Sequence, residues 1–281
     1  MEDAMKCPNC KEEIPEHVRA CVVCGNDVGY PNVRATLRNE EVKALELRIN
    51  ETKGYADSGG YSSILENFRD VVAHSAAVVC CPLGKLSELV SSDYQLYQTF
   101  YQAIGSEGRL PEDNEWDKIR GSVDSLLFPY YHEQICIGSI SIDRTGISGY
   151  GYSMVLKEMA IKDRASVFEE NTILFVKRHR IVAGDPVPLG YRAPWMKRDL
   201  LAMAKLGKRL TPKTTEAEFS KLLASSDDRD TDCIEVHIYG SIHRRAIEHL
   251  SGHKPLRRAD KVVLKSVIKK LKDIGATVEI S

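Results

Sequence analysis

The chain of 281 residues lacks features that would assign it to several broad classes. No stretch approaches about 18 uncharged apolar residues, so no transmembrane helix is expected. The opening Met-Glu-Asp-Ala-Met-Lys does not place a basic region before an apolar run, so no secretory signal is expected. There is no internal repeat and no low-complexity segment. A formal net charge of −1 predicts no particular partner from bulk charge alone.

The eight cysteines do not form a disulfide framework for a chain of this size. Four of them lie within the first 24 residues, and the other four lie in apolar, strand-like surroundings. A reducing cytoplasm fits this usage best. Apolar residues make up 43% of the chain and charged residues 28%, which is ordinary for a soluble protein with a hydrophobic core.

The clearest motif is a pair of Cys-x2-Cys turns, Cys7 with Cys10 and Cys21 with Cys24. Two residues between thiolates let a tight turn direct both sulfurs at one ion, and two such turns complete a tetrahedron. Gly25 follows the second pair, where such a turn needs an unusual backbone angle. We predict a structural Zn²⁺ in a short zinc ribbon, because four protein ligands leave no open position. The alternative is free or redox thiols.

The remaining pattern predicts an α+β chain in which residues 1–30 form the ribbon and 31–281 a larger domain. Residues 31–75 are expected to be a helical lead-in, and a bulge is expected at Gly138, where the apolar alternation slips. The main expected strands are 76–81, 134–142, 152–156, 165–168, 172–176 and 276–280. The later expected helices are 195–206, 215–223, 244–250 and 259–274.

One strand, residues 232–240, alternates in an unusual way. Ile234, Val236 and Ile238 would point to one face, while Glu235 and His237 would point to the other. A carboxylate and an imidazole are costly to bury without partners. The strand is therefore either an exposed edge or the floor of a site. We interpret it as the floor of a site, with Glu235 as its main residue.

Two upstream segments accompany this strand: Ser139-Ile140-Ser141 with the nearby turn Gly149-Tyr150-Gly151, and the run Lys-Asp-Arg-Ala-Ser-Val-Phe-Glu-Glu-Asn at 162–171. Together with Glu235-Val236-His237, their order and spacing resemble the ADP-ribosyltransferase family, especially its toxin-like branches, over roughly residues 70–250. The resemblance implies a split two-sheet α+β core that binds NAD in the cleft between the sheets. It also explains why no Rossmann-type glycine motif is needed.

The resemblance implies a role for each predicted site residue. Glu235 would be the catalytic carboxylate, and His237 stands where the family has a second acid or an amide. The early Arg or His motif of the family is matched here only by His74-Ser75. The side chains that would contact NAD are His74, Ser139, Ser141, Tyr150, Tyr152 and Arg164.

Each of these residues also has an ordinary structural interpretation. Glu235 and His237 can be polar residues of an edge strand, and the serines can be the polar face of a strand. Arg164 can pair with a nearby acid, such as Asp163 or Glu169. His74 can satisfy the last carbonyls of a helix.

Basic residues are concentrated between 177 and 213, with Tyr191 and Trp195 among them. Cations interleaved with aromatic rings suit phosphates and stacked bases, so this segment favours RNA or DNA over protein as the acceptor. A solvated face or a partner-protein surface is the alternative. The basic residues from Arg257 to Lys270 are spaced by about four and predict one solvated helix face.

The resemblance therefore implies a cytoplasmic, NAD-dependent ADP-ribosyltransferase that modifies a macromolecular acceptor, as a bacterial toxin or defence effector. A transferase toxic to its own cell would need a neutralising antitoxin. One alternative is a non-catalytic zinc-ribbon adaptor that binds nucleic acid or protein. Another is a hydrolase that uses Glu235 and His237 with a metal.

Overall fold

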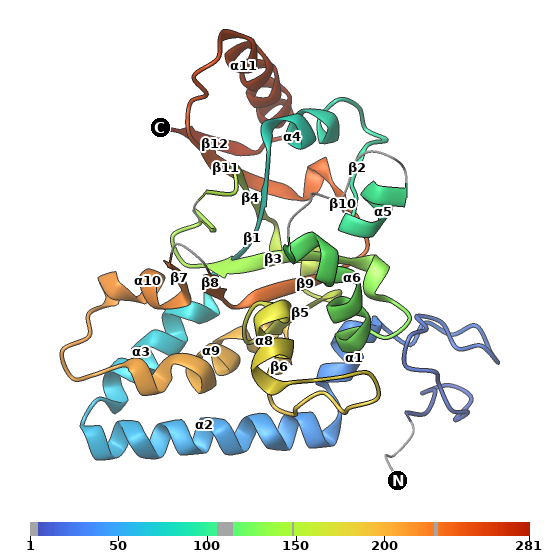
Figure 1. Cartoon of the computed structure of the whole chain (residues 1–281), viewed down its shortest axis with the longest axis vertical. Coiled ribbons are helices and arrows are strands. Elements are labelled where there is room, and N and C mark those ends of the chain that lie inside the picture. Colours follow the sequence, from blue (N-terminus) through green and yellow to red (C-terminus); the bar gives the residue numbers. More distant parts are fainter. Residues whose placement is uncertain (1–4, 106–114, 148, 228–229) are drawn as a thin grey trace.

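The computed structural model describes residues 5–105, 115–147, 149–227 and 230–281. Its centre is an eight-stranded sheet with helices on both faces, and the cysteine-rich N-terminal module lies at one end (Figure 1). All neighbouring strands are antiparallel except β11 and β12. In spatial order the strands are β12 (Thr277–Ile280), β11 (Ile247–Gly252), β4 (Tyr152–Leu156), β1 (Ala76–Cys81), β3 (Ile135–Ser141), β9 (Glu235–Tyr239), β5 (Ala165–Phe168) and β6 (Arg192–Pro194).

Strand β1 joins two halves of this sheet. Its first residues, Ala76 to Val78, pair with β3, and its last, Val78 to Cys81, pair with β4. The half formed by β3, β9, β5 and β6 is turned relative to the half formed by β12, β11, β4 and β1 (Figure 1). The predicted α+β class is confirmed, and the expected split core takes the form of one sheet bent at a shared strand.

Strand β3 runs through Gly138 without a bulge, so the predicted bulge is wrong. Its pairing with β9 keeps one register from Ile135–Tyr239 to Ser139–Glu235. The apolar residues change faces because the strand borders two cores: Ile135 faces a small cluster, and Ile140 faces the large one. Gly138 is required because a Cβ there would lie 2.6 Å from the backbone oxygen of Val78.

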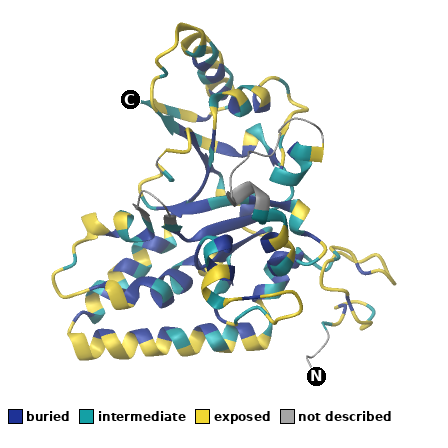
Figure 2. Ribbon diagram, in the orientation of Figure 1, coloured by how far each residue is buried: buried dark blue, intermediate teal, exposed yellow. Residues whose placement is uncertain are grey.

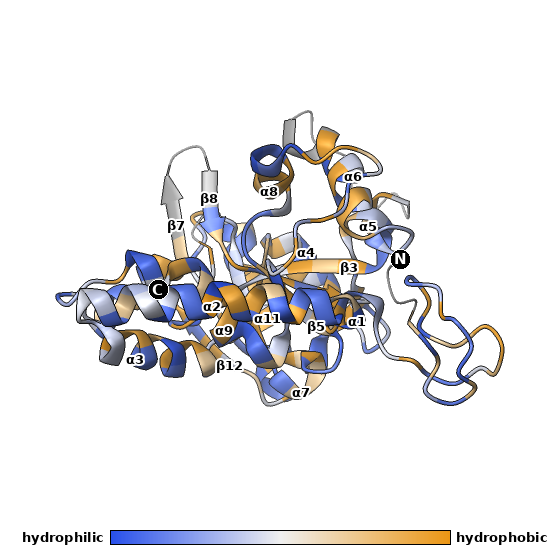
Figure 3. Ribbon diagram, turned by 90° about the horizontal axis from the view of Figure 1, so that it is seen from below, coloured by the Kyte–Doolittle hydropathy of each residue, from blue (hydrophilic) through white to orange (hydrophobic). Residues whose placement is uncertain are grey.

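Helices cover both faces of the half that contains β9, and its strands are buried between them (Figure 2). One face is covered by α2 (Asn39–Gly59), α3 (Ser62–Ala73) and α9 (Arg198–Leu206), which share the large core. The opposite face is covered by α6 (Glu115–Leu127) and α8 (Thr172–His179) (Figure 3). The strand predicted at 172–176 is therefore wrong. Asn171 starts a helix there by accepting from the backbone N–H groups of Ile173 and Leu174.

The other half of the sheet packs against α4 (Leu83–Leu89) and α11 (Arg258–Asp273). The helix predicted at 244–250 is wrong, because only 244–246 form a helical turn before β11 begins. Ile247 and Leu250 are buried in the large core, and backbone pairing with both β4 and β12 outweighs the weak helical pattern.

The remaining elements are short. A β-hairpin, β7 (Ala224–Asp227) and β8 (Asp230–Cys233), precedes β9, and β2 (Leu96–Tyr97) pairs with β10 (Ile242–His243). The short helices are α1 (Pro31–Thr36), α5 (Phe100–Gly105), α7 (Glu158–Ile161) and α10 (Phe219–Leu223). None of the helices in the described part of the chain combines the length and apolar character needed to cross a bilayer.

Candidate functional site

The four N-terminal cysteines converge. Their sulfur atoms all lie within 4.8 Å of one another. Cys7 Sγ is 3.7 Å from Cys24 Sγ, and Cys10 Sγ is 3.6 Å from Cys21 Sγ. A Zn–S bond of about 2.3 Å gives a tetrahedron with edges of about 3.8 Å, so this donor set fits a structural zinc site.

The two cysteine turns have the same backbone geometry. The N–H of Lys11 donates to the Cys7 carbonyl at 3.0 Å, and the N–H of Gly25 donates to the Cys21 carbonyl at 2.9 Å. Both residues have positive φ, 66° for Lys11 and 71° for Gly25. The Asn9 amide and the backbone N–H of Asn26 lower the pKa of Cys24 to about 6, which favours a thiolate ligand.

Arg34 on α1 attaches this module to the rest of the chain. Its buried guanidinium donates to backbone carbonyls on both sides of the second cysteine pair. The acceptors are Pro15, Glu16, Val18, Val28 and Gly29. Two residues earlier, the Asn32 amide donates to the His237 carbonyl of β9 at 2.9 Å and to Ser166 Oγ at 3.1 Å. The cysteine module is thus joined through α1 to the strand of Glu235.

Glu235 and His237 lie side by side on the face of β9 that was predicted for them. Nε2 of His237 is 2.9 Å from Oε2 of Glu235. The exposed fractions are only 3% for Glu235 and 1% for His237, so the strand is not an exposed edge. The His237 ring is fixed by Phe128 at 4.7 Å and Phe168 at 5.5 Å between centroids. The opposite residues Ile234, Val236 and Ile238 belong to the large core, as predicted.

Ser139 is brought to the same place by strand register. It is directly opposite Glu235 on β3, while Phe168 is directly opposite on β5. The Ser139 hydroxyl is buried and has no hydrogen-bond partner among the described residues. A buried hydroxyl without a partner is costly, so this atom has unused capacity to bind a ligand beside the Glu235 carboxylate.

Asp124 on α6 is a third buried ionisable group near this pair. Its carboxylate accepts from Tyr101 Oη at 2.8 Å and Thr172 Oγ1 at 3.4 Å, with an Arg120 nitrogen 3.9 Å away. Burial raises the pKa of Asp124; the Arg120 charge opposes this shift and the Glu235 charge adds to it. Sequence reasoning missed Asp124. The available signal was an acid inside the apolar stripe formed by Val123 and Leu127.

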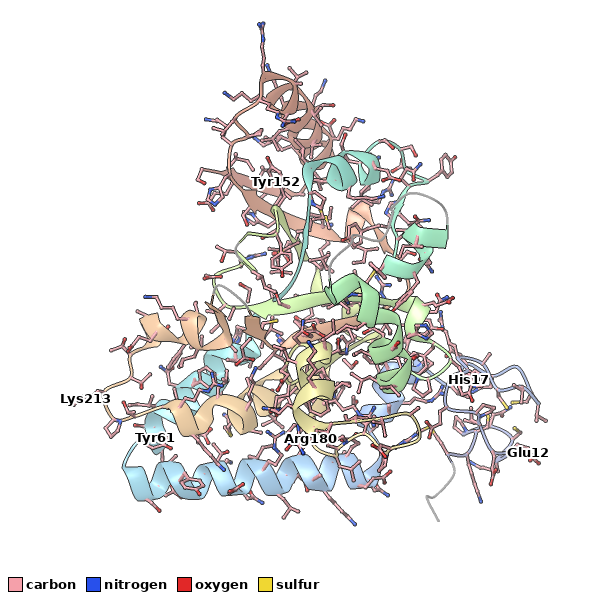
Figure 4. All side chains as sticks on the ribbon, in the orientation of Figure 1. Glu12, His17, Tyr61, Tyr152, Arg180 and Lys213 are labelled. Atoms are coloured by element: carbon pink, nitrogen blue, oxygen red, sulfur yellow. The ribbon has the colours of Figure 1, made fainter. Side chains whose placement is uncertain are left out.

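Three residues predicted to contact NAD are used elsewhere in the fold. The Arg164 guanidinium donates to the carbonyls of Ala160, Tyr239 and Ser241. Tyr152 Oη donates to the His253 carbonyl, in the half of the sheet away from β9 (Figure 4).

His74 is the C-terminal cap of α3, and its Nδ1 lies 2.8 Å from the Asp70 carbonyl. This contact is the one expected of a histidine that satisfies the last carbonyls of a helix. None of these hydrogen bonds links Arg164, Tyr152 or His74 to Glu235, and each of the three side chains has a structural role.

Ser141 and Tyr150 lie further along from Ser139. Ser141 lines a hollow of about 170 Å³ together with Asp143, Thr145, Gly146 and Lys221. Its hydroxyl donates to Asp143 Oδ1 at 2.7 Å and accepts from the Gly146 N–H at 3.2 Å. Tyr150 is exposed on the turn that follows this hollow. Ser139 and Ser141 are two residues apart on β3 and so share a strand face, but neither Ser139 nor Glu235 lines the hollow.

The basic segment 177–213 does not form one open patch, because acids from elsewhere in the chain neutralise much of it. The ion pairs are Arg178–Glu170, Arg192–Glu41, Arg198–Glu158, Lys205–Asp232, Lys208–Glu51 and Arg209–Asp232. Two further cations of the segment, Arg180 and Lys213, lie well apart in the molecule (Figure 4). Sequence distance hid these partners, since most of them lie far away along the chain.

Comparison with known proteins adds little to this description of the site. No model of a protein family matches the chain, and no curated protein matches its sequence. Among solved structures, the chain is similar to that of Thermus sp. 2.9 DarT in complex with carba-NAD+. The identity is 10%, the match covers 73% of this chain and 94% of that chain, and the TM-score is 0.35. At this identity and TM-score the similarity assigns no function, so the interpretation of the site rests on its residues.

Proposed function

We propose that this protein transfers ADP-ribose from NAD to a macromolecular acceptor, with Glu235 as the catalytic carboxylate. The observation that carries the proposal is the arrangement at β9. A buried Glu235 carboxylate is hydrogen-bonded to His237, beside a Ser139 hydroxyl that has no hydrogen-bond partner among the described residues. The sequence resemblance assigns the same carboxylate and serine to NAD chemistry. Their adjacency in register supports that assignment.

The chemistry requires a carboxylate of this kind. The bond between the ribose carbon and the nicotinamide nitrogen breaks, and its electron pair neutralises the pyridinium. Positive charge develops on the ribose, and an anion in a low-dielectric site stabilises it far more than in water. The acceptor atom then bonds to the same carbon and loses its proton to a base, a role that we assign to Glu235 or His237.

Access to Glu235 sets a condition on this mechanism. The carboxylate is covered by the cluster that α6 and α8 contribute, which includes Leu127, Phe128 and Phe175. NAD can reach it only if part of that cover moves. The Ser139 hydroxyl, which has no partner among the described residues, would then be open to the dinucleotide.

The cysteine module is proposed to hold a structural Zn²⁺, since its four sulfurs fit one tetrahedral ion and leave no position for substrate. The biological setting rests on the resemblance alone. A cytoplasmic toxin or defence effector, held in check by a neutralising partner, is the setting that a toxin-like transferase implies.

The test is incubation of the full chain with NAD labelled in its adenylate half and with RNA, DNA and protein from cells. Glu235→Gln keeps the shape of the side chain and removes its charge, so label transfer and NAD hydrolysis should fall by about 10²-fold or more. The matched control is Glu248→Gln on β11, where the carboxylate forms an exposed ion pair with Arg144. No transfer and no hydrolysis by the unmodified chain would exclude the proposal.

A second candidate is a non-catalytic adaptor that binds through the cysteine module. Val22 and Val23, between the second pair of cysteines, are 66% and 65% exposed, which suits contact with another molecule. On this hypothesis the Glu235–His237 pair is structural. Binding of an acceptor that survives Glu235→Gln and is lost in Val22→Ser/Val23→Ser, without any NAD turnover, would favour the adaptor.

A further inference from the structure

Helix α11 carries a line of cations on its outer face. Arg258, Lys261, Lys265, Lys269 and Lys272 are all exposed. At about 100° per residue they fall within an arc of about 80°, and they span about 21 Å along the helix. The two acids of the helix, Asp260 and Asp273, lie outside this arc.

These five cations are not neutralised by the fold. In the described part of the chain, none of them has an ion-pair partner. The contrast with the segment 177–213 is direct, because carboxylates pair with most of the cations there. Among the described residues, α11 therefore presents an open positive face, whereas ion pairs neutralise most cations of the segment that looked most basic in the sequence.

The inner face of α11 is already in use. Leu264, Val267 and Leu271 are buried in the large core, where the helix packs against α4 and β12. Figure 2 shows this division, with buried residues on the inner side of α11 and exposed residues outside. A helix that binds a lipid surface inserts its apolar face. Here the core-facing side chains are not available, and Val262 is the exposed large hydrophobic residue on the described α11, so the surface that can meet a partner is mainly charged.

We propose that the outer face of α11 binds the phosphate backbone of a nucleic acid. A duplex strand has a phosphate every 3.4 Å or so along the axis, so a line of about 21 Å can lie beside several phosphates. Four of the five cations are lysines, which act as point charges and suit contact with phosphates without sequence specificity. The idea that α11 holds the acceptor of the transferase rests on the proposed function. The binding itself does not.

The experiment measures binding of the full chain to fluorescent 30-nucleotide single-stranded DNA, single-stranded RNA and duplex DNA across a salt series. The test variant is Lys261→Gln/Lys265→Gln/Lys269→Gln. The matched control, Arg180→Gln/Lys197→Gln/Lys213→Gln, removes the same charge from the segment 177–213. We expect the α11 variant to lose 10-fold or more in affinity at about 0.1 M salt and its salt slope to fall by about 2–3. The control should change affinity less than about 2-fold.

Equal losses in both variants, or no nucleic-acid binding by the unmodified chain, would overturn the inference. The inference would also fail if the α11 variant lost affinity only for anionic phospholipid vesicles or for polyglutamate, because that would identify a lipid or protein partner. The proposed function is tested separately. Glu235→Gln should keep nucleic-acid affinity and lose ADP-ribose transfer, whereas the α11 variant should keep NAD hydrolysis and lose transfer to nucleic acid.

Discussion

Nε2 of His237 lies 2.9 Å from Oε2 of Glu235, and both side chains are almost completely buried. Each has lost its water and depends on the other for a polar partner. Removing one partner should therefore lower the free energy of unfolding more than removing both. This difference can be measured without knowing any substrate.

A double-mutant cycle checks this dependence. We expect His237→Leu to lower the free energy of unfolding by about 3–5 kcal/mol, because it leaves the Glu235 carboxylate buried and unpaired. Glu235→Gln/His237→Leu should cost clearly less than the sum of the single changes. Urea unfolding gives the values, and His249→Leu on β11, where the ring bonds to Thr277 at an exposed site, is the control. Additive costs within about 0.5 kcal/mol would mean that the pair is not coupled.

Metal binding is predicted to depend on Arg34 as well as on the cysteines. The chain should bind one Zn²⁺, and Cys7→Ser should abolish tight binding while buried Trp195 keeps its fluorescence, because the large core does not include the module. Arg34→Met removes five donated hydrogen bonds to the module and should speed zinc release to a chelator.

The control for Arg34 is Arg38→Met, which removes a neighbouring arginine whose contact with the module is an exposed ion pair with Glu16. Zinc release followed with a colorimetric chelator distinguishes the two variants. Identical release from both would show that the carbonyl contacts of Arg34 do not stabilise the metal site.

What the sequence predicted correctly depends on short distances along the chain. The four cysteines converge because each Cys-x2-Cys turn is local, and Glu235 and His237 share a face because side chains alternate along a strand. Ser139 was predicted through its motif, but its position opposite Glu235 is fixed by pairing between strands almost one hundred residues apart.

What the sequence did not predict depends on packing between distant segments. Arg192 looked available for a ligand until folding placed Glu41 beside it, and Lys208 until folding placed Glu51 there. Asp124 joined the site because α6 packs over β9, which no local pattern specifies. The same holds for β11, whose strand conformation comes from its two neighbours in the sheet.

The raised pKa of Asp124 predicts a particular pH dependence of stability. A carboxyl whose pKa is higher in the folded chain contributes stability that is present below its unfolded pKa and lost as the pH rises through its folded pKa. Asp124→Asn should therefore gain stability relative to the unmodified chain as the pH rises from about 4. Urea unfolding of both proteins across this pH range measures the difference.

Asp143 provides a control of opposite sign. Burial opposes ionisation there, but donors including Ser141 and Thr145 outweigh it and lower the pKa of this carboxyl. Its stabilising contribution is present above the unfolded pKa and is lost as the pH falls through the folded value. Asp143→Asn should therefore lose stability relative to the unmodified chain as the pH rises. The same trend in both variants would contradict the assignment of Asp124 as a carboxyl disfavoured by burial.

Gly138 gives a test of the bent sheet itself. A Cβ at this position would lie 2.6 Å from the Val78 oxygen and 3.1 Å from a methyl carbon of Val79, both on β1. Gly138→Ala must push apart the strands that join the two halves, and we expect it to cost about 1–3 kcal/mol. Gly84→Ala in α4 meets no atom within 4 Å and should instead stabilise by about 0.5–1 kcal/mol. Thermal and urea unfolding of the two variants measure this contrast. A neutral Gly138→Ala would mean that β1 and β3 do not approach as closely as their pairing requires.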